Sequence, residues 1–167
     1  MYKRKGYLIL NMNCTHCGSD APQYKCSQCN AHFFCNTKCH SLSPLCIPHG
    51  NIETLTTENT FYRKVLWTSP NMQVVLMNLP KNDFIEMEIH PENDQFFRVE
   101  QGQIRIIAQK DTKALVLTGE AGFACILPKG TKHKIMNNGQ GDLKVYTIYS
   151  PPHHAPDKID PVHKEKM

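Results

Sequence analysis

The chain has 167 residues, a formal net charge of +4, 20% charged residues and eight cysteines. This length allows one ordinary domain of about 100 residues plus one small module that needs extra stabilisation. The cysteines show where that module lies, because seven of the eight precede residue 50.

The positive charge belongs to the N-terminal part of the chain. Residues 1–52 carry five Lys or Arg against the single Asp20, whereas residues 53–167 carry fourteen residues of each sign. Three of the five cations are Lys3, Arg4 and Lys5, in a segment that we expect to be a solvated tail. We therefore do not expect a nucleic-acid partner.

The N-terminus also argues for a reducing compartment. Its apolar run, Tyr7–Leu10, is too short for a signal peptide or a membrane span. Clustered cysteines without a secretory signal are typical of metal ligands, and we expect zinc in place of disulfides. The expected location is the cytoplasm or the nucleus, with no membrane attachment.

The cysteines occur in closely spaced pairs that suit metal binding. Eight ligands match two tetrahedral zinc ions of the structural kind, and such ions supply most of a small module's folding free energy, on the order of 10 kcal/mol each. The eight candidates are Cys14, Cys17, Cys26, Cys29, Cys35, Cys39, Cys46 and His49.

Two segments, Tyr24–Cys29 and Phe33–Cys39, resemble the HIT and MYND families of zinc fingers. This resemblance implies a cross-brace module, in which the ligands of the two ions interleave. It assigns Cys14, Cys17, Cys35 and Cys39 to the first zinc and Cys26, Cys29, Cys46 and His49 to the second. The last pair departs from the family order, so His40 remains an alternative to His49. The families are mostly protein-binding adaptors, and a stabilising cap on the next domain is the competing interpretation.

Short apolar runs separated by turn formers follow from residue 61 onward. They predict a mainly β domain, an antiparallel sandwich or barrel. The runs are Val74–Leu79, Phe84–Ile89, Phe96–Val99, Ile104–Ala108, Ala114–Leu117, Cys125–Leu127 and Val145–Tyr149. Before them, the Thr-rich stretch Glu53–Thr60 is interpreted as a linker or an approach strand. After them, the prolines of 151–156 indicate a surface tail. The predicted organisation is a tail (1–12), a zinc module (13–52), a β-barrel (53–152) and a C-terminal tail (153–167).

One motif in the β region is specific. The pattern Gly122-x5-Pro128-x-Gly130-x2-His133-x3-Asn137 matches the second cupin motif at every defined position. Pro128 and Gly130 suit a hairpin turn, and His133 follows on the next strand. The resemblance implies a cupin barrel, which is a jelly roll or double-stranded β-helix.

The first cupin motif is present with two substitutions. Gly102 sets its register and places Glu88, His90 and Gln95 where the family has His, His and Glu. Glu88 and His90 are two residues apart and so face the same side of a strand. Together with His133, these residues are the candidate ligands of one divalent metal, Zn, Mn, Fe or Ni.

Residues 60–155 resemble small bacterial cupins that are described as mannose-6-phosphate-isomerase-like, a label for the barrel that does not identify a substrate. Two functions remain open. One is a metal-dependent enzyme acting on a small polar molecule. The other is a non-catalytic ligand sensor or adaptor whose zinc module recruits a protein. The resemblance also implies a homodimer.

Several other residues have simpler expected roles. We expect His16 and His32 to be exposed loop residues, and Arg98 and Glu100 to be an exposed strand face in preference to a substrate clamp. Cys125 is expected to fill the core, as are Tyr146 and Tyr149, while His153 and His154 belong to the predicted tail.

Overall fold

The structure is a computed structural model that describes residues 25–26 and 48–163. The chain divides into two units, Met1–Gly50 and Asn51–Met167. In the first unit the described part is one antiparallel ladder, in which β1 (Lys25–Cys26) pairs with β2 (Pro48–His49). Six of the predicted zinc ligands lie outside the described residues, as do His16, His32 and the alternative ligand His40: Cys14, Cys17, Cys29, Cys35, Cys39 and Cys46. The two-zinc module therefore stays a prediction.

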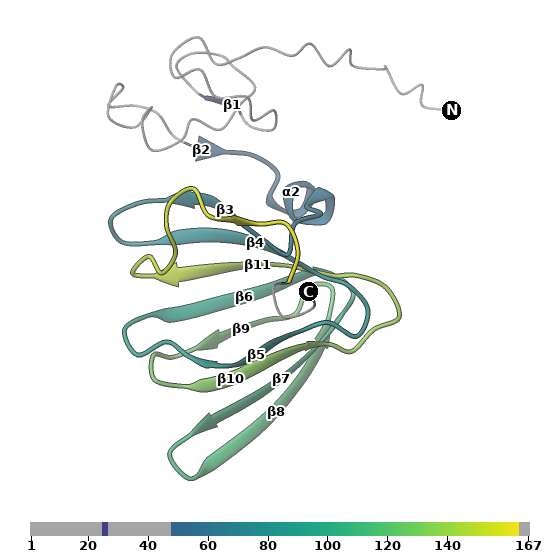
Figure 1. The fold of residues 1–167 in the computed structure, drawn as a ribbon, viewed down its shortest axis with the longest axis vertical. Coiled ribbons are helices and arrows are strands. Elements are labelled where there is room, and N and C mark those ends of the chain that lie inside the picture. The colour runs from purple at the N-terminus through teal and green to yellow at the C-terminus, as the bar shows by residue number, and fades with distance from the viewer. Residues whose placement is uncertain (1–24, 27–47, 164–167) are drawn as a thin grey trace. The chain divides into compact units, whose positions relative to one another are not determined.

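The second unit is a sandwich of two antiparallel sheets (Figure 1). The four-stranded sheet has the order β5-β10-β7-β8, and the six-stranded sheet has the order β12-β3-β4-β11-β6-β9. The strands are β3 (Arg63–Thr68), β4 (Gln73–Leu79), β5 (Phe84–Ile89), β6 (Asp94–Gln101), β7 (Gln103–Lys110), β8 (Lys113–Glu120), β9 (Ala124–Leu127), β10 (Lys132–Asn137), β11 (Leu143–Ser150) and β12 (Ile159–Asp160). The mainly β, cupin-like fold predicted from the sequence is confirmed.

The core lies between the two sheets because the strands alternate buried and less buried residues. In β6, for example, Gln95, Phe97 and Val99 are buried, while the residues between them are less so. The other sheet contributes residues such as Ile106 and Ile135, which are fully buried. Every predicted apolar run lies within a strand, so the period-two pattern of the sequence located this core.

Gly102 shows why the first motif needs a glycine. It connects β6 to β7 with a φ of +88°, and a Cβ at this position would lie 2.6 Å from the backbone oxygen of Asp142. No side chain fits there without moving backbone. The glycine that sets the motif register is therefore also required by the turn.

The Thr-rich stretch is a helix, so its interpretation as a linker or strand was wrong. Helix α2 (Ile52–Glu58) begins after Asn51, whose side-chain oxygen accepts a hydrogen bond from the Thr54 backbone N–H at 3.0 Å. Thr56 is buried, and its hydroxyl donates to the Ile52 carbonyl at 2.7 Å, so this buried polar group has a partner. Within the described part of the chain, no helix is long and apolar enough to cross a membrane.

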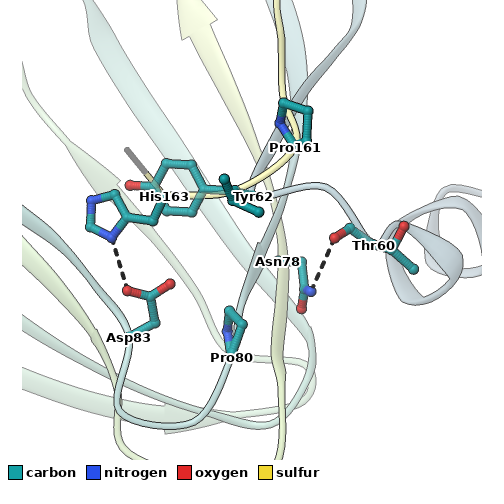
Figure 2. A pocket seen from close by; sticks show the side chains of 8 residues that line it. Thr60, Tyr62, Asn78, Pro80, Asp83, Pro161 and His163 are labelled. Atoms are coloured by element: carbon teal, nitrogen blue, oxygen red, sulfur yellow. Dashed lines mark hydrogen bonds and ion pairs between the residues drawn. The ribbon is translucent and has the colours of Figure 1, made fainter. Parts of the chain in front are cut away.

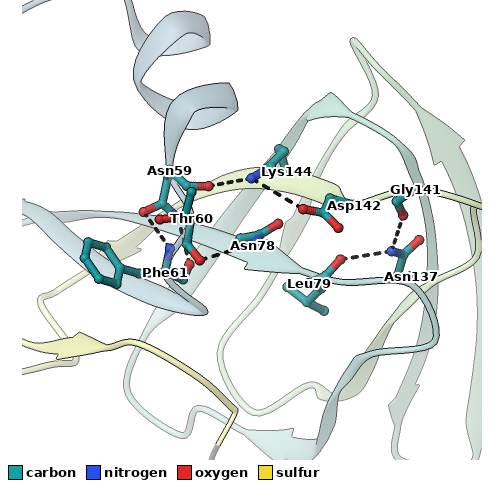
Figure 3. A network of polar contacts seen from close by, with 9 residues as sticks. All are labelled: Asn59, Thr60, Phe61, Asn78, Leu79, Asn137, Gly141, Asp142 and Lys144. Atoms are coloured by element: carbon teal, nitrogen blue, oxygen red, sulfur yellow. Dashed lines mark hydrogen bonds and ion pairs between the residues drawn. The ribbon is translucent and has the colours of Figure 1, made fainter.

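A network of polar contacts fixes the end of this helix to the six-stranded sheet (Figure 3). The Lys144 ammonium, on β11, is buried and donates to the backbone oxygen of Asn59, the C-cap residue of α2, at 2.6 Å. The Asp142 carboxylate lies 3.7 Å from the same ammonium. A buried cation at a helix C-terminus satisfies carbonyl groups that the helix leaves unpaired.

The segment after β11 is not the free tail that we expected. Gln73 holds it through its side chain, donating to the His154 carbonyl at 2.8 Å and accepting from the His154 N–H at 2.8 Å. The chain then forms β12, which pairs with β3 at the edge of the six-stranded sheet. The prolines end β11, as predicted, but they do not prevent the chain from rejoining the sheet.

Candidate metal centre

Three side chains with metal-binding groups meet between the sheets. The ligand atoms of Glu88, His90 and His133 all lie within 4.8 Å of one another. Oε1 of Glu88 lies 3.2 Å from Nε2 of His90 and 3.4 Å from Nε2 of His133. Both imidazoles are buried, whereas the Glu88 side chain is 30% exposed, so the cluster is closed on the side of the histidines and open beside Glu88.

Strand register explains this meeting. Glu88 and His133 are direct partners in the antiparallel pairing of β5 with β10, and paired residues point to the same face. His90 lies two residues after Glu88 and returns to that face. The backbone N–H of Gly130, whose φ is +75°, donates to the His90 carbonyl at 2.8 Å, so this turn also holds the second ligand in place. The turn joins β9 to β10, which lie in different sheets, so its prediction as a hairpin turn was wrong.

The tautomer of His133 is set by its backbone partner. Its Nδ1 lies 3.0 Å from the Thr131 carbonyl oxygen, which can only accept a hydrogen bond. Nδ1 therefore carries the proton, and in the neutral ring Nε2 has a lone pair. This Nε2 is buried without a hydrogen-bond partner among the described residues and faces the Glu88 carboxylate. Such an arrangement is common for histidines that bind metal ions.

The fourth predicted ligand, Gln95, comes from the opposite sheet. It is only 1% exposed, and its amide nitrogen donates to the Tyr149 hydroxyl at 2.8 Å. The ring of Tyr149 packs edge-on against His90, with centroids 5.4 Å apart. The Oε1 atom of Gln95 has no partner among the described residues, so a carbonyl oxygen is left over at this end of the barrel.

The charges of the cluster favour an ionised Glu88. Burial raises the pKa of this carboxyl, but the neighbouring His133 and His90 rings, by hydrogen bonding and by their charge when they carry a second proton, outweigh burial and hold the pKa well below its usual range. Burial raises the pKa of Tyr149 above its usual range, and the Glu88 charge adds to this effect. The site thus combines an anionic oxygen with a neutral phenol.

The sequence analysis missed His153, which it placed in the tail. Its ring lies 4.3 Å from the His90 ring, centroid to centroid, and stacks on Tyr149 at 5.3 Å. Burial lowers the pKa of His153, and the charge of His90 lowers it further. The only signal in the sequence was the return of two histidines after a proline pair, which does not reveal where the chain goes.

Two pockets lie near the cluster. One, of about 200 Å³, is lined by Glu88 and Arg63 among others, and the sequence analysis did not single out Arg63. The second, of about 480 Å³, is shown in Figure 2. There His163 bonds the Asp83 carboxylate at 2.9 Å and stacks on Tyr62 at 4.5 Å. Tyr62 and His163 line both pockets.

The remaining candidates lie away from the cluster. Arg98 bonds Glu100 at 2.9 Å, and both residues alternate with the core residues Phe97 and Val99 on the outer face of the sheet. The Arg98 side chain is 41% exposed, as expected, but that of Glu100 is only 7% exposed, so the expectation of an exposed face was wrong for Glu100. Cys125 packs against the core while partly buried, and burial raises the pKa of its thiol to about 11. Neither feature contributes to the metal cluster.

Comparison with known proteins agrees with this geometry. The model for the Cupin domain matches residues 75–149, a range that contains all four predicted barrel ligands. A relative in Acanthamoeba polyphaga mimivirus, the uncharacterized protein L612, is 46% identical over 113 residues, which are 66% of this chain and 69% of that protein. Residues 75–149 are therefore a Cupin domain.

Two further proteins are similar to this chain. The uncharacterized protein YrkC of Bacillus subtilis is 40% identical over 106 residues, covering 62% of this chain but only 57% of YrkC. The crystal structure of BH2720 from Bacillus halodurans superimposes with a TM-score of 0.65 at 36% identity, covering 68% of this chain and 87% of BH2720.

Proposed function

We propose that the barrel binds one divalent metal through Glu88, His90 and His133, with Gln95 as a fourth donor, and that it acts on a small polar molecule at the open side of that site. Imidazole with oxygen donors suits Zn, Mn, Fe or Ni. When bound, such a metal would supply a Lewis acid with room for a ligand from solution.

The observation that carries the proposal is the contact between His133 and Glu88. A lone pair on a buried nitrogen faces an ionised carboxylate oxygen at 3.4 Å, and both atoms are acceptors. Two facing acceptors repel unless a cation lies between them, either a metal ion or an extra proton on the ring. A metal would also satisfy the buried Nε2 atom, which has no other partner in the described structure.

Gln95 and Tyr149 supply the opposite wall. The hydrogen bond between them fixes the Gln95 amide and leaves Oε1 for a further partner. Burial raises the pKa of the Tyr149 phenol, which stays neutral at pH 7, and its oxygen accepts the Gln95 amide N–H. Gln95 and Tyr149 therefore form a wall that orients a bound ligand and excludes water, while the open side near Glu88 admits the ligand.

The test is the metal content of the full chain, expressed without a histidine tag and purified without chelator. We expect the wild type to carry one metal equivalent that the double variant His90→Ala/His133→Ala loses. Glu86→Gln is the matched control, because Glu86 is on the same strand as Glu88 but lies outside the cluster. Equal metal content in all three proteins would overturn the proposal.

The N-terminal module is proposed to have a separate role from the barrel. We propose two structural zinc ions in residues 13–52 and a protein partner that this module binds. One observation supports the assignment of the second zinc. The β1–β2 ladder pairs Cys26 with Pro48 and Lys25 with His49, so the backbones of the two predicted ligands, Cys26 and His49, lie on neighbouring strands one position apart. If the barrel binds a metal but shows no turnover, the ligand-sensing adaptor is the better description of the whole chain.

A further inference from the structure

A group of charged residues lies beside the metal cluster, in the pocket of about 200 Å³. Arg63 and Asp160 from the six-stranded sheet and Glu86 and Glu88 from the other sheet line its walls. Because Glu88 is one of the proposed metal ligands, a molecule in this pocket would lie next to the metal. The charged groups of the pocket therefore bear on what that molecule is.

Arg63 is held in place with donors to spare. It pairs with the core residue Met77, so its side chain lies on the inner face of the sheet, and it is 18% exposed. Its Nη1 atom donates to the Asp160 carboxylate at 3.1 Å, and its guanidinium lies 5.4 Å from the centroid of the Tyr62 ring. Its Nε atom is buried with no hydrogen-bond partner in the described structure. A guanidinium has five N–H donors, and Asp160 uses only some of them.

The neighbouring carboxylates do not cancel the charge of Arg63. Asp160 also pairs with Lys158, at 2.9 Å, and Glu86 pairs with Lys134, at 3.4 Å. After burial, the charge of Arg63 is the next largest cause that lowers the pKa of His154, so it acts on groups around the site. Asp160 and Glu86 therefore each pair with a lysine as well, whereas Glu88 lies against the two histidines of the cluster.

We propose that Arg63 binds the carboxylate of a small monoanionic acid and thereby selects the ligand of the metal site by charge. This inference rests on the proposed metal centre. A planar guanidinium matches a carboxylate, and the pocket volume equals that of about six or seven water molecules in the liquid, the size of an acid with few carbon atoms. Arg63, Lys158 and Lys134 against Asp160 and Glu86 leave one positive charge, which matches a monoanion better than a dianion such as phosphate.

The test uses acetate as the probe and acetamide, which is isosteric and neutral, as the matched control ligand. The full chain is loaded with Mn²⁺, which prefers oxygen and imidazole donors over thiolates. Acetate that displaces metal-bound water lowers the water-proton relaxation rate. Independently of metal, acetate shifts the ¹⁵N–¹H resonance of Arg63 Nε, which exchanges slowly because it is buried.

Three variants separate the role of Arg63 from general effects. Arg63→Gln removes the charge, and Arg63→Lys keeps the charge without the planar fork. Arg98→Gln removes a cation from the outer face and serves as control. We expect acetate affinity to fall about ten-fold or more in Arg63→Gln and less in Arg63→Lys, with Mn²⁺ affinity preserved in all.

The outcomes distinguish the two proposals. If Mn²⁺ fails to bind the wild-type barrel, the proposed metal centre fails, and the Arg63 resonance alone decides whether an acid binds there. If Mn²⁺ binds but acetate and acetamide bind equally, or the Arg63 resonance does not respond to acetate, the inference about Arg63 is wrong while the metal centre stands. The resonance is measured in the wild type, so the role of Arg63 is decided even where Arg63→Gln does not fold.

Discussion

The two ends of the barrel interior are built on the same strands but from opposite kinds of residue. On β10, His133 lies at one end and Ile135, two residues later, lies towards the other. On β6, Gln95 and Val99 are separated in the same way by four residues. At one end the buried residues are Ile, Val and Leu, among them Ile104, Leu79 and Leu143. At the other end, buried polar atoms lack partners within the described structure: Arg63 Nε, His90 Nδ1, Gln95 Oε1 and His133 Nε2. The first end stabilises the fold, and the second is shaped for a ligand.

The largest effect should come from the apolar end. Leu143 is fully buried, so Leu143→Ala should lower the free energy of unfolding by about 2 to 5 kcal/mol. His133→Leu, at the polar end, should change it by less than about 1 kcal/mol in metal-free protein, because it also removes a buried atom without a partner. Denaturant unfolding of both variants measures the contrast. Similar losses at the two ends would mean that the polar end is structural.

Metal should stabilise only through the polar end. At one hundred times the dissociation constant, Mn²⁺ should raise the free energy of unfolding by about 2.7 kcal/mol. Glu88→Gln should remove most of this gain, since it replaces the anionic ligand. Unfolding with and without Mn²⁺ tests both proteins, and Glu86→Gln should behave as the wild type. An undiminished gain in Glu88→Gln would place the metal elsewhere.

Adding one methyl group at Gly102, in the turn between β6 and β7, should lower the free energy of unfolding. Gly102→Ala should cost about 1 to 3 kcal/mol, because the new Cβ would meet the Asp142 backbone at 2.6 Å in a left-handed conformation. Gly122→Ala is the matched control: its φ is +92°, but nothing lies within 4 Å of the added Cβ. Thermal unfolding should rank Gly102→Ala as the more damaging. The reverse order would show that the contact with Asp142 is not limiting.

The smallest effect is a pH dependence at His154. Burial lowers its pKa from 6.5 to about 3, with the charges of Arg63 and His153 acting in the same direction. Below pH 6.5 the His154 imidazole is therefore protonated in the unfolded chain but stays neutral in the folded chain. The resulting contribution to stability is complete above pH 6.5 and is lost as the pH falls towards 3. In His154→Leu, the free energy of unfolding of metal-free protein should fall less between pH 6.5 and 4.5. An unchanged slope would show that His154 titrates normally.

The sequence predicted the strands and the site residues for different reasons. Alternating apolar residues located the core, and the spacing around Gly102 and His133 identified three residues that the fold brings together. Helix α2 was missed because its threonines suggest a strand, and only the Asn51 cap and the burial of Leu55 against the sheet make it a helix.

Arg63 and His153 could not be identified from spacing. Their positions depend on β12 pairing with β3 and on Gln73 holding the chain after β11, which are contacts between residues roughly eighty to one hundred positions apart. Alternation did contain one usable signal, since Arg63 is two residues before the core residue Val65. A charged residue at a position that the alternation assigns to the inner face is therefore a candidate site residue, as a histidine in a motif is.

The most direct test of the polar end is anomalous diffraction from crystals of the full chain grown with Mn²⁺. We predict one anomalous peak within about 2.0 to 2.3 Å of Glu88 Oε1, His90 Nε2 and His133 Nε2. The proposed metal centre would be contradicted if crystals grown with Mn²⁺ showed no peak between these three atoms. His133 Nε2 and Glu88 Oε1 would then lie at hydrogen-bond distance, with a proton on Nε2 in place of the metal.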